Sequence, residues 1–307
     1  MRTAIREGSD VARRVFAMKR LMPVLAGMTV TAIRKVAAQV RDTLEVDRDL
    51  ASAVRAVESA TVAGKRVLIT GSTRGIGRAL ATAFASRGAS VVVHGREEND
   101  VRRAALAIAL AADAADRVRG VAVDLSAAGA GRELVERAVS ELGGLDVVIN
   151  NAAIHDPTRK PIWSTSSEEM LRTLAVNCLA AFDVSVAAGR SMMAQRVSGR
   201  ILNISSGAAD SRHVSDSGIA SYGISKIALE GLSEYLAAEA HTVTITTLRP
   251  DTIATDMVAP LFPPEQRWKM LPADSMIPAV MHLVCAPREE VHGKVFEQLA
   301  LIRSLAS

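Results

Sequence analysis

The chain has 307 residues, of which 49% are hydrophobic and 3% are aromatic, and its formal net charge is +4. That length and apolar content are ample for a buried core, as one large domain or two small ones. Residues 1–41 carry nine Lys/Arg and two acidic residues, whereas the remainder carries 28 basic and 31 acidic residues, which excludes a basic, nucleic-acid-binding body. Cys178 and Cys285 have neither metal-site nor disulfide-framework spacing, and the histidines have no metal-ligand spacing. We therefore expect a reducing compartment and no metal site.

The first 60 residues differ from the rest and predict a helical N-terminal extension. Apolar residues recur at helical spacing from Val11 to Leu25 among basic residues, and Pro23 interrupts this amphipathic pattern. The uncharged run 21–33 is too short to span a bilayer as a helix. Three alternatives stay open for the arm, namely an export signal, an organelle transit peptide and a helix on a membrane surface. We favour an extension that packs on the body or on a partner subunit, in a cytoplasmic protein.

From residue 65 onward, short β-branched runs alternate with helical stretches. Each run is apolar throughout rather than at every second residue, as strands buried on both faces should be. The alternation predicts an α/β fold of the Rossmann type in a single domain, residues 61–307, with helices on both faces of a doubly wound parallel sheet of about seven strands. Strands are expected at 66–70, 90–94, 120–124, 145–149, 200–205 and 243–248. Helices are expected at 75–87, 97–116, 131–142, 167–195 and 221–240, after a charged helix within 42–60.

The segment TGSTRGIG, residues 70–77, joins the first predicted strand to the first helix of this body. Gly71 would permit a tight turn, Gly75 a close approach of backbone to a pyrophosphate, and Gly77 close packing of helix on strand. Free N–H groups and the helix dipole would favour an anion there. The spacing is not the commonest one for dinucleotides, so on this motif alone a plain strand–helix turn remains an alternative.

The end of the second predicted strand indicates which dinucleotide binds. An NAD-selective site carries an acidic side chain there, but Gly95 occupies that position and Arg96 follows it. Arg74 lies in the glycine loop. Two guanidinium groups without a carboxylate suit a 2′-phosphate, which favours NADP(H) over NAD(H). The alternative is that both arginines are ordinary solvated surface residues.

The segment SYGISK, residues 221–226, places Tyr222 and Lys226 four residues apart on a predicted helix, hence on one face. A neighbouring ammonium group stabilises tyrosinate, so we expect it to lower the phenol pKa from about 10. Tyr222 would then be a general acid for a carbonyl oxygen. The alternative for such a pair is a solvated contact on the helix surface.

Between about Lys65 and Leu299 the chain resembles the short-chain dehydrogenase/reductase family. The glycine loop and the Tyr–Lys pair are two of six motifs that occur in the family's order. The others are DL (124–125), NNAA (150–153), Asn177 in LAVNCLAA, and ILNISSG (201–207), in which Ser206 is the better match to the family's serine. Residues 293–301 resemble the family's last strand, which takes part in subunit contact, so the resemblance implies a homodimer or homotetramer.

The resemblance also implies roles for particular residues. Tyr222 would protonate the carbonyl oxygen, or take the proton back in oxidation, and Ser206 would donate a hydrogen bond to the same oxygen. Lys226 would lower the phenol pKa and hold the nicotinamide ribose, and Asn177 would hold the water through which Lys226 exchanges protons. The implied cofactor-binding residues are Gly71, Ser72, Thr73, Arg74, Gly75, Ile76, Gly77, Arg96, Asp124, Leu125, Asn151, Ala152, Tyr222, Lys226, Pro250 and Thr255.

The chain departs from the family pattern in places that bear on activity and substrate. Ala153 and Asp251 stand where the family usually has glycine, and the stretch from Ser206 to Tyr222 is longer than usual. We expect substrate contacts from 154–166, 207–220 and 256–275, with a proline-rich lid in the last of these. Candidate pocket residues in these segments, none preferred over the others, are His155, Trp163, His213, Met257, Phe262 and Trp268.

These patterns together predict an NADP(H)-dependent oxidoreductase that reduces a ketone or aldehyde to an alcohol, or catalyses the reverse. The alternative is an NADP-binding protein of this type with a regulatory or scaffold role and little turnover. Expected partners are a small carbonyl or alcohol substrate and further copies of the chain, with no nucleic acid and with membrane contact through the arm not favoured.

Overall fold

The computed structural model describes residues 42, 45–58, 60–210 and 218–306. The chain divides into two compact units, Met1–Arg48 and Asp49–Ser307, and the sheet belongs to the second. The predictions for residues 1–41 lie outside the described residues. Residues 45–56 are helical, within the expected charged helix, and the side chains of Ala53 and Val57 are buried in the core of the second unit.

Seven parallel strands form one sheet in the order β3-β2-β1-β4-β5-β6-β7. The chain starts in the middle of the sheet, builds one half, and returns to build the other, so the predicted doubly wound fold is confirmed. The strands are β1 (Arg66–Ile69), β2 (Ser90–Gly95), β3 (Val118–Ala122), β4 (Val147–Asn150), β5 (Arg200–Ile204), β6 (Thr244–Arg249) and β7 (Val295–Glu297).

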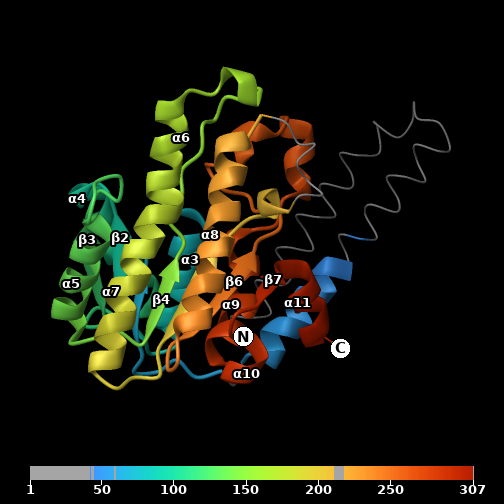
Figure 1. The fold of residues 1–307 in the computed structure, drawn as a ribbon. Coiled ribbons are helices and arrows are strands. Elements are labelled where there is room, and N and C mark those ends of the chain that lie inside the picture. The colour runs from blue at the N-terminus through green and yellow to red at the C-terminus, as the bar shows by residue number, and fades with distance from the viewer. Residues whose placement is uncertain (1–41, 43–44, 59, 211–217, 307) are drawn as a thin grey trace. The chain divides into compact units, whose positions relative to one another are not determined.

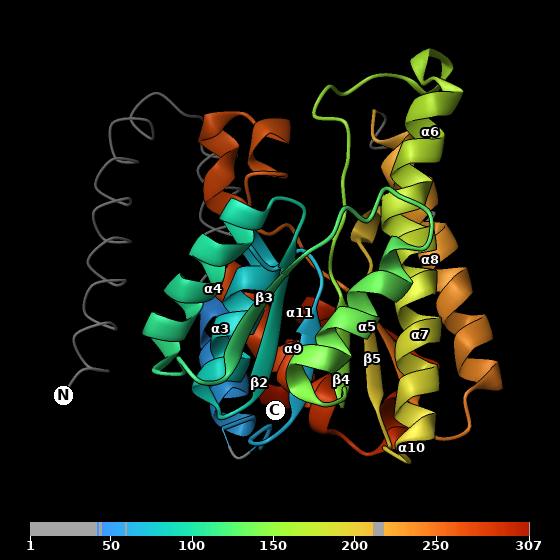
Figure 2. The ribbon, with the colours of Figure 1, turned by 90° about the vertical axis from the view of Figure 1, so that its left-hand side faces the viewer.

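Helices cover both faces of the sheet (Figures 1 and 2). Those of the first half of the unit are α3 (Gly75–Ser86), α4 (Glu98–Ala112) and α5 (Ala130–Leu142). Those of the second half are α6 (Ser167–Leu174), α7 (Ala180–Ala194), α8 (Ala220–Glu239), α9 (Ile277–Cys285), α10 (Arg288–Val291) and α11 (Gln298–Ala306). Figure 2 shows the sheet between α3 and α4 on one side and α5, α7 and α8 on the other.

The side chains of each strand alternate between two cores, one on either face. In β1, Val67 and Ile69 pack into the core beneath α3, α4 and α9, whereas Leu68 packs into the core beneath α5 and α7. All three side chains are 0% exposed. Both faces of β1 are therefore apolar, which is why its sequence lacks polar residues at alternate positions.

The helices agree with the predicted ranges to within a few residues, but the C-terminal segment differs. The resemblance placed a strand over 293–301, whereas β7 ends at Glu297 and Gln298 begins α11. The side chain of Gln298 is 1% exposed and donates to the carbonyl oxygen and hydroxyl of Ser275 at 3.0 Å each. This buried amide ties the start of α11 to the segment before α9 and fixes where the strand stops.

The long helix Ser167–Ala194 contains a π-helical turn, Ala175–Leu179, between α6 and α7. Such turns insert an extra residue and often mark functional positions, and Asn177 lies within this one. Among the described residues this helix alone is long and apolar enough to cross a membrane by length and composition. In this fold, however, it packs against α5 and α8.

Candidate active site

The ends of β1, β2, β4, β5 and β6 border a cleft of about 1430 Å³, at the edge of the sheet where such folds bind ligands. The cleft brings together most of the residues that were predicted to bind cofactor. The most distant of these in the chain are Gly71 and Thr255, which are 184 positions apart. Of the predicted catalytic residues, Tyr222, Lys226 and Ser206 line the cleft, and Asn177 lies buried behind it. Of the predicted cofactor-binding residues, all but Ser72 and Gly77 line it.

The glycine loop has the backbone geometry that only glycine adopts without strain. Gly71 and Gly75 have φ of 63° and 55°. A Cβ on Gly71 would lie 2.9 Å from the Cα of Ala152, and one on Gly77 would lie 2.5 Å from the carbonyl oxygen of Gly71. The loop, the helix and the segment after β4 therefore pack backbone against backbone.

The N-terminus of α3 opens into this loop without a cap of its own. Arg74 is the N-cap residue and makes no side-chain cap hydrogen bond, and the first turn has no acidic residue. The N–H groups of the first turn are thus left for another acceptor, and the helix dipole favours an anion. The cradle fits the pyrophosphate of a dinucleotide.

Ser72 and His94 form a hydrogen-bond network that supports the glycine loop. This network was not predicted from the sequence. Ser72 is fully buried; its hydroxyl donates to the Ile69 carbonyl at 2.6 Å and accepts from the His94 N–H at 2.9 Å. The His94 ring accepts from the Gly71 N–H at 3.0 Å through Nδ1, and its Nε2 lies 3.0 Å from the Val123 carbonyl. The Ser72 side chain, predicted to bind cofactor, is thus used inside the loop and does not reach the cleft.

Asn151 and Thr70 join the loop to β4. The Asn151 side chain donates to the carbonyl oxygens of Thr70 and Gly71 at 2.9 and 3.1 Å. The Thr70 hydroxyl accepts from the N–H groups of Asn151 and Ala152, at 2.9 Å each. Asn151, predicted to touch cofactor, therefore also holds the shape of the phosphate cradle.

At the end of β2, any side chain at Gly95 would crowd its neighbours. A Cβ there would lie 2.6 Å from the Thr73 side chain and 3.0 Å from Val101. Arg96 and Arg74 are exposed and line the cleft, as predicted for a phosphate site. Each has an acidic neighbour that the sequence reasoning did not count, because Arg96 pairs with Glu97 at 2.9 Å and Arg74 lies 3.9 Å from Asp256.

Tyr222, Lys226 and Ser206 meet at the centre of the cleft. The Lys226 Nζ lies 5.7 Å from the centroid of the Tyr222 ring and donates to the Ile204 carbonyl at 2.7 Å. Burial lowers the pKa of Lys226 to about 8. Burial also raises the pKa of Tyr222 above its ordinary value, against the opposing effect of a side-chain hydrogen bond from Ser206. The expectation of a lowered phenol pKa is therefore wrong here, because burial is the largest effect on Tyr222 and the hydrogen bond from Ser206 does not offset it.

Asn177 connects the catalytic helix to the loop after β4. Its amide group donates to the Ile154 carbonyl and to the Ser225 hydroxyl at 2.9 Å each, and its oxygen accepts from the Ile154 N–H at 2.8 Å. Ser225 in turn donates to the Tyr222 carbonyl at 2.6 Å. Both amide hydrogens are engaged, so only the Asn177 oxygen has capacity left for a water molecule.

The departure at Asp251 does not strain the backbone. Among the described residues, the non-glycine residues with positive φ are Asp113 and Arg196, so Asp251 is not one of them. Its N–H donates to the Gln298 side chain at 3.0 Å, and its carboxylate accepts from the Thr252 N–H at 2.6 Å. Ala153, the other departure, lines the cleft.

On the substrate side, the loop after β4 contacts the segment after β6. The His155 Nε2 lies 2.7 Å from the Met257 carbonyl, and its ring packs edge-on against Tyr222 with centroids 6.0 Å apart. The Arg159 guanidinium lies 5.8 Å from the centroid of the Phe262 ring. Trp163 is 94% exposed and Trp268 47%, so neither fills the pocket, and His213 lies outside the described residues. Within the described part of the chain, no three His, Cys, Asp or Glu side chains group as metal ligands.

Comparison with known proteins gives a consistent result. Residues 65–266 match the short chain dehydrogenase family. The chain is 36% identical over 193 residues to the short-chain reductase protein NovJ of Streptomyces niveus, covering 62% of this chain and 70% of that one. It is 33% identical over 197 residues to the 3-oxoacyl-[acyl-carrier-protein] reductase FabG of Haemophilus influenzae, covering 63% and 76%. The crystal structure of a short chain dehydrogenase from Burkholderia cenocepacia in complex with NADP superposes with a TM-score of 0.66 at 27% identity, covering 77% and 96%.

Proposed function

Because this chain belongs to the short-chain dehydrogenase/reductase family of oxidoreductases, we propose that it reduces a ketone or aldehyde to an alcohol with NADPH. The observation that carries the proposal is the meeting of Tyr222, Lys226 and Ser206 beside the uncapped helix N-terminus of the glycine loop. The bound nicotinamide would supply the hydride. NovJ and FabG carry the name reductase, which supports the same class of reaction.

In reduction, Tyr222 would be the proton donor to the carbonyl oxygen. A phenol whose pKa lies above its ordinary value keeps its proton at neutral pH and can give it to a carbonyl oxygen that gains negative charge. Ser206, within hydrogen-bond reach of that phenol, would donate to the same oxygen and stabilise the developing alkoxide. Lys226 would place a positive charge beside the Tyr222 ring and bind the hydroxyl groups of the nicotinamide ribose.

The test compares wild type with Tyr222→Phe on a panel of ketones and aldehydes, following NADPH consumption. We expect the variant to lose at least about 100-fold in kcat while binding NADPH within about twofold of wild type, since the phenol hydroxyl is one contact among many. Equal turnover by the two proteins would remove Tyr222 from the mechanism. If wild type binds NADPH but reduces none of the substrates, the result would favour the alternative, a regulatory or scaffold protein.

The preference for NADP(H) is part of this proposal and rests on Arg74, Arg96 and the absence of an acidic side chain at Gly95. The Burkholderia cenocepacia relative was crystallised with NADP, in line with that preference. We expect Arg96→Ser to weaken NADPH binding by about tenfold or more and to leave NADH binding nearly unchanged. Parallel weakening of both cofactors would contradict the assignment of Arg96 to the 2′-phosphate. Because a reductase of this kind consumes NADPH, we propose that it acts in the cytoplasm.

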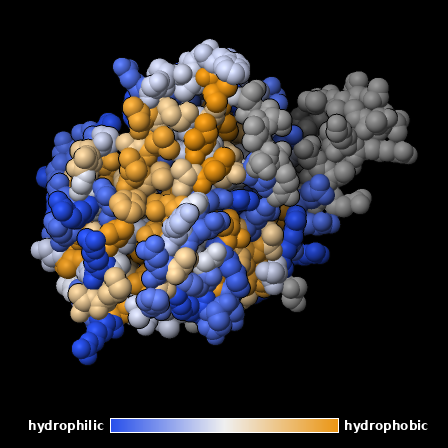
Figure 3. Space-filling view, viewed as in Figure 1, coloured by the Kyte–Doolittle hydropathy of each residue, from blue (hydrophilic) through white to orange (hydrophobic). Residues whose placement is uncertain are grey.

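We also propose that the chain is a homo-oligomer, and that a second copy covers the outer face of α6, α7 and α8. Figure 3 shows apolar side chains gathered over these helices. Exposed members of this face are Leu171, Leu179, Phe182, Ile224 and Ile227. A contiguous apolar face of this kind marks an interaction site in a water-soluble fold.

Sedimentation velocity tests this oligomer proposal with one variant on the proposed face and one away from it. Phe182 lies on α7, whereas Leu106 lies on α4 and is 62% exposed. Phe182→Glu should reduce the oligomer size, because a buried carboxylate at a subunit contact has no partner. Leu106→Glu should leave it unchanged. A monomeric wild type, or equal effects of the two changes, would contradict the proposal.

A further inference from the structure

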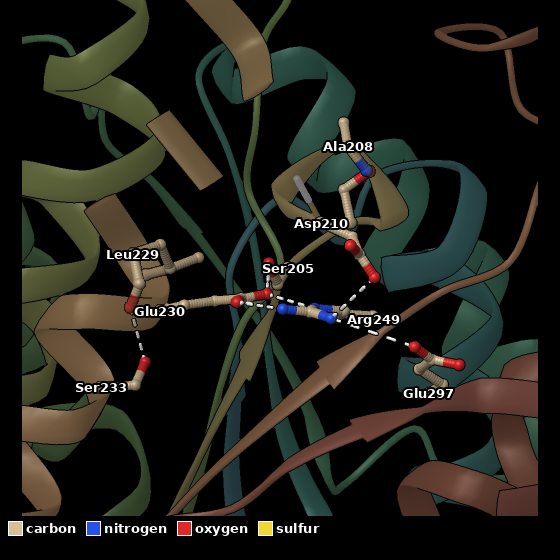
Figure 4. A network of polar contacts seen from close by, with 9 residues as sticks. Ser205, Ala208, Asp210, Leu229, Glu230, Ser233, Arg249 and Glu297 are labelled. Atoms are coloured by element: carbon tan, nitrogen blue, oxygen red, sulfur yellow. Dashed lines mark hydrogen bonds and ion pairs between the residues drawn. The ribbon is translucent and has the colours of Figure 1, made fainter. Parts of the chain in front are cut away.

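At the carboxyl end of β6, Arg249 faces carboxylates from three other elements of the fold. Its Nε and Nη2 donate to the two oxygens of Glu230 on α8, at 2.8 and 2.7 Å (Figure 4). Its Nη1 lies 3.5 Å from Asp210, after β5, and 3.9 Å from Glu297 at the end of β7. The two-point contact with Glu230 is the strongest of these, because both N–H groups align with the carboxylate.

The carboxylates that face Arg249 on α8 and after β5 are buried, whereas the Arg249 side chain is 21% exposed and itself lines the cleft. Glu230 is 8% exposed and Asp210 is 7% exposed. The Ser205 hydroxyl also donates to Glu230, at 2.6 Å. Hydrogen bonding to Glu230 raises the pKa of Arg249, so the guanidinium stays charged. A buried carboxylate would be costly without such partners, since removal of one member leaves an uncompensated charge.

The position of Glu230 connects this pair to the reaction centre. Tyr222, Lys226 and Glu230 follow one another at intervals of four residues on α8, so they lie on one face of that helix. Ser205 precedes Ser206, and Arg249 precedes Pro250 in the wall of the cleft. The bonds of Glu230 therefore join the helix that bears the phenol and the amine to the two strands that bear the serine and the cleft wall.

The Arg249–Glu230 pair also affects the electrostatic environment of Lys226. The Glu230 carboxylate and the Cys178 side chain each favour the charged form of Lys226, against the effect of burial. The Arg249 guanidinium offsets the field of Glu230, and Asp210 and Glu297 share that guanidinium. The potential at Lys226 and at the adjacent Tyr222 thus depends on how completely Arg249 neutralises Glu230.

We propose that Arg249 and Glu230 form a positioning pair, which holds α8 against β5 and β6 and sets the electrostatic potential at Lys226 and Tyr222. The part of this inference that concerns hydride transfer rests on the proposed function. Neither residue touches the reacting atoms, so both act through the Tyr222–Lys226 pair.

The chain's two tyrosines, Tyr222 and Tyr235, allow a direct measurement. Tyr235 is 75% exposed, so Tyr235→Phe removes its signal and leaves Tyr222 as the single phenol. The ultraviolet absorbance of tyrosinate, followed against pH in the full chain, then gives the pKa of Tyr222 without any need for turnover. Circular dichroism over the same pH range confirms that each variant stays folded.

In this background, loss of a negative charge should lower the pKa of Tyr222 and loss of a positive charge should raise it. We expect Glu230→Gln to lower it by about 0.5 to 1 pH unit, as a unit charge about two helical turns away does at an intermediate effective dielectric constant. Arg249→Met should raise it by a similar amount, and Arg249→Lys should return it toward wild type. The double variant Glu230→Gln/Arg249→Met should lie near wild type, and it avoids the unpaired carboxylate that could prevent Arg249→Met from folding.

A second two-point pair, which is partly buried, provides the matched control. Arg66 binds Asp146 at two points, 3.0 and 3.1 Å, at the opposite end of β1 from the glycine loop. Asp146→Asn should leave the Tyr222 titration unchanged. A folded Glu230→Gln with an unchanged Tyr222 pKa would overturn the inference, as would an equal shift in Asp146→Asn.

Kinetics separates positioning from general stability. With an active carbonyl substrate, Glu230→Gln should lower kcat and move its pH profile, with NADPH affinity within about twofold of wild type because the glycine loop is untouched. Parallel loss of kcat and NADPH affinity would indicate a structural role only and would overturn the inference. If wild type turned over no carbonyl compound, the proposed function would be contradicted, and the tyrosine titration would still decide this inference.

Discussion

His94 makes the cofactor loop sensitive to acid in a way that can be measured. The ring is 3% exposed, and burial lowers its pKa to about 4 from an ordinary value of 6.5. With the proton on Nε2, the ring donates to the Val123 carbonyl and accepts from Gly71 through Nδ1. A second proton would place two donors face to face at Nδ1, so the folded protein keeps this ring neutral.

The size of the effect follows from linkage. Below pH 6.5 the unfolded chain takes up a proton at His94 that the folded chain refuses until the pH approaches 4. The stability that neutral His94 contributes is therefore fully present above pH 6.5 and falls as the pH drops toward 4. At about 1.4 kcal/mol per pH unit, the complete loss is about 3.4 kcal/mol, of which about 2 kcal/mol is lost by pH 5.

Urea unfolding of wild type and His94→Gln at about pH 7.5 and about pH 5 measures this contribution. Gln cannot titrate, so the difference in unfolding free energy between the two proteins should shrink by about 2 kcal/mol at the lower pH. The other histidines and the carboxylates are common to both proteins, so their titration cancels in the difference. His241→Gln, at an exposed position, is the matched control and should follow wild type at both pH values.

A difference between wild type and His94→Gln that stays constant from one pH to the other would refute this reasoning. So would an equal change in His241→Gln. A second readout concerns function, because protonation removes the acceptor of the Gly71 N–H. Because the folded ring takes up its proton only as the pH approaches 4, NADPH binding by wild type should weaken more steeply than binding by His94→Gln as the pH falls from 5 to about 4.

Two further substitutions test the backbone of the cleft. Gly77→Ala should weaken NADPH binding by about tenfold or more in a fluorescence titration, because its Cβ would lie 2.5 Å from the Gly71 carbonyl; Gly189→Ala, whose Cβ meets nothing within 4 Å, should bind normally. Asp251→Gly should change kcat/KM by less than about threefold and lower stability by about 0.5 to 1 kcal/mol in thermal unfolding, because Asp251 already has a negative φ and glycine only adds freedom to the unfolded chain. A tenfold gain in activity would instead show that the carboxylate hinders the reaction.

Much of the fold could be predicted because its signals are local. A strand buried on both faces must be apolar at every position, and a loop packed backbone against backbone must be glycine, so β1 and the Gly71–Gly77 loop are evident in the sequence. Four-residue spacing likewise places Tyr222 and Lys226 on one helix face. Where the reasoning used only chain order it was less accurate, as at β7, which stops at Glu297 because the buried Gln298 starts α11.

The sequence by itself determined the sheet, its helices and the set of side chains that meet at the carboxyl ends of the strands. Only the tertiary structure decided the pKa values and hydrogen-bond partners of those side chains, because burial and pairing depend on residues distant in the chain. The raised pKa of Tyr222 comes from burial that no local pattern reveals, and His94 reaches Gly71 from the next strand. Arg249 meets Glu230, 19 positions earlier in the chain, because β6 packs beside α8. The energy of a charged group depends on the groups that surround it in space.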